Sequence, residues 1–310
     1  MEHRAEQETG DDFATLLEQY LPDSKQPLTT KGEISAHSDD IDSDISIARN
    51  LFRTKKGAEG LGACENILAE YRHIPLDQRY KVLSLMARYL YEQFKSTKDT
   101  HSVEKGYSFY EDARTFADQI SDPVEALNFT VATAEARFLH SAAIDDQDME
   151  RGRELLLEGY QELTPFFGFR SQLKRFRVNK AASRISARFH RKFASEEEKE
   201  VWFNKWFNHS EKAYKLAPDP SRSDSAKMNA ANNFAEALLV AAQNASTPED
   251  RQKYLTDSSK VISEAVAIVT TFGAGERSRQ FIVNVLRQIA STQPDSEENQ
   301  RLLILAGYII

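Results

Sequence analysis

Nine lysine and arginine residues lie between residues 169 and 193, and the same stretch contains no aspartate or glutamate. The whole chain of 310 residues, by contrast, has a formal net charge of −8. Arginine suits carboxylate and phosphate groups, because its planar guanidinium presents a fixed fork of hydrogen-bond donors. The chemistry that this stretch indicates is therefore the binding of an anion.

A helix over residues 169–193 would sort these cations onto one face. At 100° per residue, six of them fall within about 100° of one another. These six are Arg170, Lys174, Arg177, Arg184, Arg188 and Arg191. Apolar residues flank the row, with Val178 and Ile185 on one side and Phe169 and Phe176 on the other. We therefore expect a basic stripe between two packed flanks.

Three interpretations of this stripe remain open at the level of sequence. The stripe is a solvated face paired with nearby carboxylates such as Glu196, Glu197 and Glu198, or it lines an anion-binding groove. In the third interpretation the acidic N-terminus of the same chain covers it, since tethering raises the effective concentration of that segment.

Residues 1–44 form a distinct acidic arm, with twelve acidic and three basic residues. Prolines and a glycine interrupt any regular pattern there, so we expect a flexible arm. One amphipathic helix is predicted within it, over residues 11–21, and its apolar face would need a groove in which to dock. The residues of that face are Phe13, Leu16, Leu17, Tyr20 and Leu21.

Residues 45–310 show helix after helix and no convincing strand pattern. Capping residues precede a proline or an acidic first turn at Asp122, Ser195 and Thr247. A small residue followed by a larger one recurs near every 50 residues, in Ala87-Arg88-Tyr89, Ala136-Arg137-Phe138, Ala187-Arg188-Phe189 and Ala237-Leu238-Leu239. This period predicts an all-α solenoid, an elongated superhelix of about five antiparallel helical hairpins.

The repeat register adds candidates to the basic stripe. Arg88, Arg137 and Arg188 hold equivalent positions on successive first helices, so we expect them to form a ladder of cations. Asn229, Asn232 and Asn233 on the next first helix are candidates to hold a C-terminal carboxylate. The alternative is that they are three polar residues on an exposed helix face. Trp202 and Trp206, at i and i+4, indicate a buried helix contact.

Residues 209–242, HSEKAYKLAPDPSRSDSAKMNAANNFAEALLVAA, resemble a tetratricopeptide unit. The likeness consists of a helix ending in Ala-Tyr-x-Leu-Ala-Pro-Asp, followed by the first helix of the next unit. The other units share only the spacing, and they exceed the family's usual length of about 34 residues. The resemblance implies a tetratricopeptide-like repeat that binds a peptide or protein in a groove lined by its first helices.

Motifs for other chemistry are incomplete. Asp40, Asp42 and Asp44 open like a calcium loop, but Ile45 and Leu51 replace its glycine and closing glutamate. The single cysteine excludes a cysteine zinc cluster, and the seven histidines form no His-x-x-x-His pair. No run approaches the roughly 20 apolar residues of a membrane span, and the acidic N-terminus does not look like a signal peptide. We expect a cytoplasmic protein that is not an enzyme and needs no metal or cofactor.

These observations predict an adaptor or regulator that binds an acidic or carboxylate-bearing protein segment along the basic groove. One alternative is the binding of single-stranded RNA or DNA through residues 169–193, with neighbouring phenylalanines stacking on bases. Another is a regulatory subunit that docks through the N-terminal helix or the C-terminal end.

Overall fold

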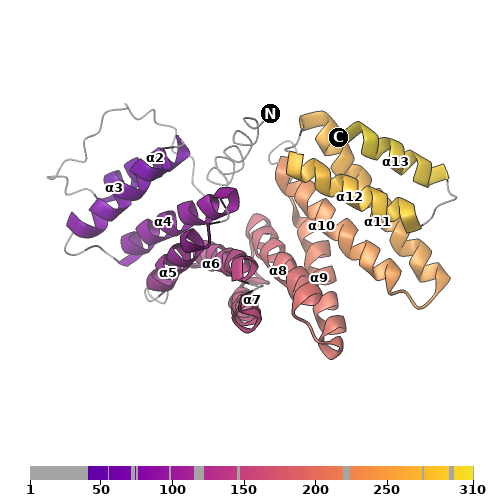
Figure 1. Cartoon of the computed structure of the whole chain (residues 1–310), viewed down its shortest axis with the longest axis horizontal. Coiled ribbons are helices and arrows are strands. Elements are labelled where there is room, and N and C mark those ends of the chain that lie inside the picture. Colours follow the sequence, from indigo (N-terminus) through magenta and orange to yellow (C-terminus); the bar gives the residue numbers. More distant parts are fainter. Residues whose placement is uncertain are drawn as a thin grey trace. The chain divides into compact units, whose positions relative to one another are not determined.

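The computed structural model describes the chain in ten stretches. They are residues 41–54, 56–70, 74, 76–97, 99–114, 122–144, 147–218, 224–273, 276–292 and 297–309. The acidic arm up to residue 40, with the docking helix predicted over 11–21, lies outside these stretches. Every regular element within them is helical (Figure 1).

The chain divides into two compact units, residues 1–162 and 163–310. The described helices of unit 1 are α2 (Ile41–Arg53), α3 (Gly57–Glu70), α4 (Leu76–Thr97), α5 (Thr100–Arg114), α6 (Pro123–Ile144) and α7 (Met149–Leu163, whose last residue falls in unit 2). Those of unit 2 are η2 (Thr164–Phe166), α8 (Gln172–Lys192), α9 (Glu196–Leu216), α10 (Asp224–Gln243), α11 (Pro248–Phe272), α12 (Glu276–Thr292) and α13 (Glu297–Ile309).

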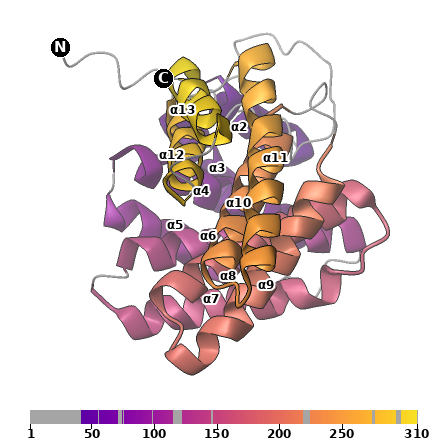
Figure 2. The same ribbon diagram turned by 90° about the vertical axis from the view of Figure 1, so that its right-hand side faces the viewer.

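Consecutive helices pack in pairs, as the repeat spacing predicts. The pairs α2–α3 and α4–α5 pack in unit 1 (Figure 1), and α8–α9, α10–α11 and α12–α13 pack in unit 2. Figure 2 shows α12 and α13 from the side. Short connections make each pair antiparallel. The expected all-α solenoid of helical hairpins is thereby confirmed.

The small residues of the repeat lie where helices touch. Ala87, Ala136, Ala187 and Ala237 are all buried, with exposed fractions between 0% and 6%. Gly106 of α5 serves the same purpose in the α4–α5 pair, because a Cβ there would lie only 3.2 Å from the carbonyl oxygen of Ala87. The sequence period therefore marks the contact positions of the first helices.

The predicted helix starts are also present. Ser195 accepts a hydrogen bond from the backbone of Glu198, whose side chain accepts one in return from the Ser195 amide, which completes a capping box for α9. Thr247 accepts from the Asp250 amide at the start of α11, and Asp122 accepts from the Val124 amide at the start of α6. These caps end the connections before α6, α9 and α11.

Candidate interaction surface

The basic stretch forms α8, a helix that is buried on most of its circumference. Val178, Ile185 and Phe189 are buried on one side, and Phe176 on the other, as the sequence predicts. Phe189 stacks on Trp202 of α9 at 4.0 Å between ring centroids. Trp202 and Trp206 are themselves buried, which confirms the predicted helix contact. The cations of the predicted stripe that lie on α8 are among its residues that are not buried, which also include Leu173, Arg175, Lys180 and Lys192.

We call the six cations of this stripe the α8 ridge. Arg170, just before the helix, and Arg191, in its last turn, are exposed, whereas the four between them are half-buried. The half-buried side chains fit the usual behaviour of long cationic residues, which lay their stems over apolar surface, and the Nε atom of Arg188 is buried. The guanidinium of Arg188, for example, lies 6.0 Å from the ring centroid of Phe193.

Arg191 has the best-defined surroundings of the ridge. Its Nη2 lies 2.8 Å from Oε2 of Glu236 on α10, and its guanidinium lies 4.7 Å from the ring centroid of Trp206. The Arg191 side chain remains 47% exposed, while Glu236 is only 20% exposed. A cation stacked on an aromatic face and paired with a carboxylate is thus held at the edge of the α8–α10 contact.

A polar chain behind Arg191 joins the helices of this region. Trp206 donates from Nε1 to Oδ1 of Asn233 at 3.3 Å, and Asn233 donates from Nδ2 to the hydroxyl of Ser183. The hydroxyls of Ser183 and Ser210 are 2.8 Å apart and buried. Both ends of the Asn233 amide therefore serve the packing of α8, α9 and α10.

The three asparagines differ in exposure and in contacts, and their joint action on a partner's carboxylate stays a prediction. Asn229 is exposed, Asn232 is 3% exposed and Asn233 is committed to Trp206 and Ser183. Consecutive residues differ by 100° around a helix, so Asn232 and Asn233 cannot point the same way. Asn229 alone keeps an exposed amide.

A buried histidine lies deeper in the α8–α9 contact. His209 is 6% exposed, its Nδ1 donates to Oδ1 of Asn179 at 2.8 Å, and its ring packs against Phe167 at 4.5 Å. Burial, reinforced by Lys212 and Lys205, lowers the pKa of His209 to about 4. At neutral pH the side chain is therefore an uncharged part of the core.

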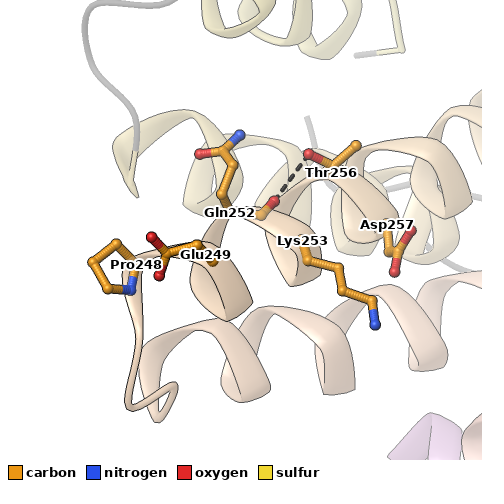
Figure 3. A pocket seen from close by; sticks show the side chains of 6 residues that line it. All are labelled: Pro248, Glu249, Gln252, Lys253, Thr256 and Asp257. Carbon is orange, nitrogen blue, oxygen red and sulfur yellow. Dashed lines mark hydrogen bonds between the residues drawn. The ribbon is translucent and has the colours of Figure 1, made fainter.

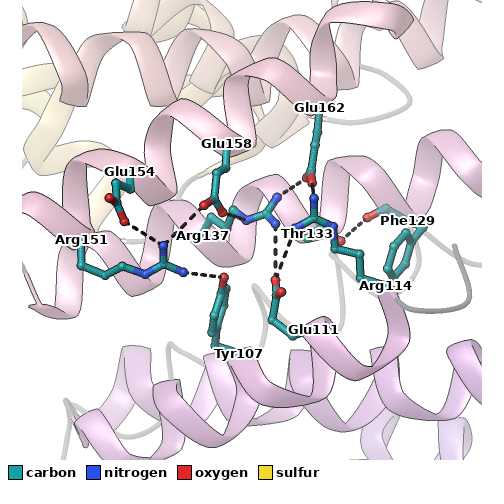
Figure 4. A network of polar contacts seen from close by, with 10 residues as sticks. All are labelled: Tyr107, Glu111, Arg114, Phe129, Thr133, Arg137, Arg151, Glu154, Glu158 and Glu162. Carbon is teal, nitrogen blue, oxygen red and sulfur yellow. Dashed lines mark hydrogen bonds and ion pairs between the residues drawn. The ribbon is translucent and has the colours of Figure 1, made fainter.

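In unit 1, Arg137 of α6 lies at the centre of an ion-pair network (Figure 4). Its side chain is 0% exposed, and three carboxylates surround it. Glu111 of α5 and Glu158 of α7 each lie 3.3 Å from a guanidinium nitrogen, and Glu162 of α7 also accepts a hydrogen bond. Burial is the largest influence and lowers the pKa of Arg137, but Glu162 and Tyr107 together outweigh it, so the pKa is raised.

Two further arginines extend the network at its edges. Arg114 of α5 contacts Glu162 at 3.0 Å, and Arg151 of α7 contacts Glu158 at 3.4 Å. Arg151 also donates to the hydroxyl of Tyr107 at 3.2 Å. Carboxylates that are shared between two arginines therefore connect α5, α6 and α7.

The network corrects the prediction that Arg137 faces a partner. Its guanidinium is occupied inside unit 1, and Leu238, at the equivalent position of unit 2, is also buried. At these two positions the residue after the small alanine thus faces a neighbouring helix rather than an open surface. The side chain of Arg88 lies outside the described residues, so the predicted ladder keeps Arg188 as its described, half-buried member.

Sequence reasoning missed the carboxylates that pair with these arginines. Glu111 and Glu158 recur 47 residues apart on successive second helices, so the repeat register itself places one on each side of Arg137. Glu236 directly precedes Ala237, the small residue of its unit. Comparing the positions of opposite charges between repeats would have indicated both contacts.

A shallow depression at the start of α11 does not form a convincing binding site. Its lining residues all come from residues 248–257, and the bond from Thr256 to the carbonyl of Gln252 is internal to the helix (Figure 3). In the part of the chain that the structure describes, no three histidine, cysteine or acidic side chains gather as a metal would require. No described helix is long and apolar enough to cross a bilayer.

The end of unit 2 exposes two large apolar side chains. Leu303 and Ile304 of α13 are 52% and 59% exposed, whereas Ala306 and Ile309 of the same helix are buried against the core of α10–α13. Part of the apolar C-terminal run therefore packs on the preceding hairpin. Docking of another protein at this end stays a prediction.

Comparisons with known proteins give likenesses to several solved structures, of which two follow. No family model and no curated protein matches the chain. The nuclear import adaptor Nro1 of S. pombe is 12% identical over 87% of this chain and 93% of its own, with a TM-score of 0.49. A de novo designed helical repeat protein is 16% identical over 76% of this chain and 94% of its own, with a TM-score of 0.21. Neither likeness is close enough to assign a function.

Proposed function

We propose that this protein is a non-enzymatic interaction scaffold, an adaptor or regulator that binds an acidic protein segment along the α8 ridge. The main support for the proposal is the ion pair of Arg191. At the protein surface its guanidinium already binds a carboxylate, that of Glu236. Four further cations, from Lys174 to Arg188, lie on the same face of α8, and Arg170 is exposed just before the helix. Asn229 adds an exposed amide on α10.

The chemistry of the ridge favours carboxylates spaced along a peptide. Guanidinium groups pair with carboxylates in a planar, two-bond geometry, and half-buried stems limit the conformations that each side chain must lose on binding. The positive face also opposes the overall negative charge of the chain, so an acidic partner is drawn to this surface and repelled elsewhere.

Nucleic acid binding has less support than it had from the sequence. Phe176 and Phe189 are buried at 3% and 0% exposure, so neither offers a face on which a base can stack. The ridge is also confined to a single helical face of an acidic protein.

Binding of a labelled peptide tests the proposal. Fluorescence anisotropy of a fluorescein-labelled decamer of glutamate should show saturable binding to the full chain, and a decamer of glutamine should not bind. The variant R184E/R188E should weaken binding about tenfold or more, since each reversed charge acts over short distances in a partly shielded site. The control R251E/K253E makes the same change in net charge on α11 and should retain the affinity.

Two measurements keep the test decisive. The first is circular dichroism, which establishes that each variant is folded. The second is the affinity of R170E, whose substitution lies at an exposed position before α8 and disturbs no packing. Equal weakening by the ridge and control variants would show that the ridge is not the site. Tight binding of a single-stranded oligonucleotide, with a steep log-linear salt dependence, would favour the nucleic-acid alternative.

A further inference from the structure

Glu236 occupies the position that a partner's carboxylate would take at Arg191. We infer that Glu236 is a built-in competitor, an internal carboxylate that an acidic segment must displace from Arg191 in order to bind. This inference rests on the proposed function of the α8 ridge and specifies how binding there is limited. Its basis is the 2.8 Å ion pair between α8 and α10.

The first step of the argument is that Arg191 does not need Glu236 in order to keep its place. Its guanidinium lies 4.7 Å from the ring centroid of Trp206, which is fully buried. The indole is fixed in turn by its hydrogen bond to Asn233. Removing the charge of Glu236 therefore leaves the aromatic surface on which Arg191 rests, and the cation stays at the same edge of the ridge.

The second step is that Glu236 occupies the side of the guanidinium that faces α10. The Arg191 side chain is 47% exposed, so its remaining donors lie toward solvent and toward any segment that follows the ridge. A partner's carboxylate placed there would approach Glu236 closely, and two like charges on one guanidinium repel each other. Binding at Arg191 thus requires Glu236 to move away from the guanidinium, and this displacement lowers the affinity for the segment.

The third step concerns selectivity. A weakly acidic segment with isolated carboxylates cannot displace an internal carboxylate that is already in place at high effective concentration. A segment with several consecutive acidic residues can displace it, because its other carboxylates bind the rest of the ridge at the same time. Glu236 would therefore restrict the ridge to densely acidic segments, which is a form of specificity by competition.

Replacing Glu236 by glutamine tests the inference, with the glutamate decamer as the probe and the full chain as the protein. E236Q should bind the decamer about two- to fivefold more tightly, the size of an exposed charge pair. The gain should be larger for a decamer of alternating glutamate and glycine, whose carboxylates are sparser. E249Q, which removes one exposed glutamate from the start of α11, is the matched control and should change neither affinity.

A double-mutant cycle ties the effect to Arg191. In the R191Q background the E236Q substitution should give no gain, because the shared cation is absent. An unchanged or weaker affinity of E236Q, in a chain whose wild-type form binds the decamer, would overturn the inference and leave the proposed function intact. If no form of the chain binds either decamer, the ridge is not an acidic-segment site, and both proposals are wrong.

Discussion

Arg137 provides the sharpest test of how unit 1 is held together. Replacing it by methionine keeps an unbranched side chain of similar length and removes the charge. Glu111, Glu158 and Glu162 would then lie close together without their common cation. Because these carboxylates are contributed by α5 and α7, their mutual repulsion acts against the packing of α6 between those helices.

The size of the effect follows from the exposure of the partners. Removing one member of a fully buried ion pair typically costs about 3–5 kcal/mol. Here the arginine is fully buried, but the three carboxylates are 25% to 39% exposed and are partly solvated. Arg114 and Arg151 also continue to neutralise Glu162 and Glu158. We therefore expect R137M to destabilise the protein by about 3 kcal/mol, at the lower end of that range.

Urea unfolding followed by circular dichroism at neutral pH measures this change. R151M is the control, because it removes an arginine of the same network that is 37% exposed. Losing the ion pairs of Arg151 should lower the free energy of unfolding by less than about 1 kcal/mol. R137K should lie between R137M and the wild type, since lysine restores the charge but not the planar fork. If R137M costs no more than R151M, the network is a surface feature and the argument from burial fails.

Two further outcomes are expected. In the unfolded chain His209 is protonated below its ordinary pKa of 6.5, whereas in the folded chain it is protonated only near pH 4. Protonation therefore favours the unfolded chain, so the contribution of His209 to the free energy of unfolding is complete above pH 6.5 and falls as the pH drops toward 4. Between pH 7 and pH 5 the wild type should lose about 2 kcal/mol that H209Q does not lose, and parallel urea-stability curves for the two would contradict this assignment. S195A removes the cap of α9 and should cost about 1 kcal/mol in the same urea assay, with the exposed S246A as its control.

The repeat register was predictable because it depends on side-chain size. Two helices can approach closely only where a small residue lies between them, so Ala87, Ala136, Ala187 and Ala237 mark contacts that any packing of the helices must respect. Helix starts were predictable for a similar reason. A capping side chain such as Ser195 acts on amides within three residues of itself, so its effect is local in sequence.

The environment of the arginines was not predictable from one helix at a time. A helical wheel gives the angle of Arg137 on α6 but not which faces the neighbouring helices cover, and α6 has buried residues around much of its circumference. On α8 the wheel succeeds, because that helix has one clear polar stripe between apolar flanks. The sorting of charge was thus predictable, whereas the identity of the partner carboxylates required the packing of three helices.

The carboxylates of α7 have a regular spacing that limits what they can specify. Glu154, Glu158 and Glu162 recur at every fourth residue, which is close to one helical turn. If α7 slid along its axis by a turn, each glutamate would arrive where its neighbour had been. Arg114 of α5 and Arg137 of α6 would then meet an almost identical row of carboxylates. Charge alone therefore leaves the axial register of α7 ambiguous. The buried side chains of Leu155, Leu156 and Leu163 are not repeated in this way, and they must select the one position in which the helix comes to rest.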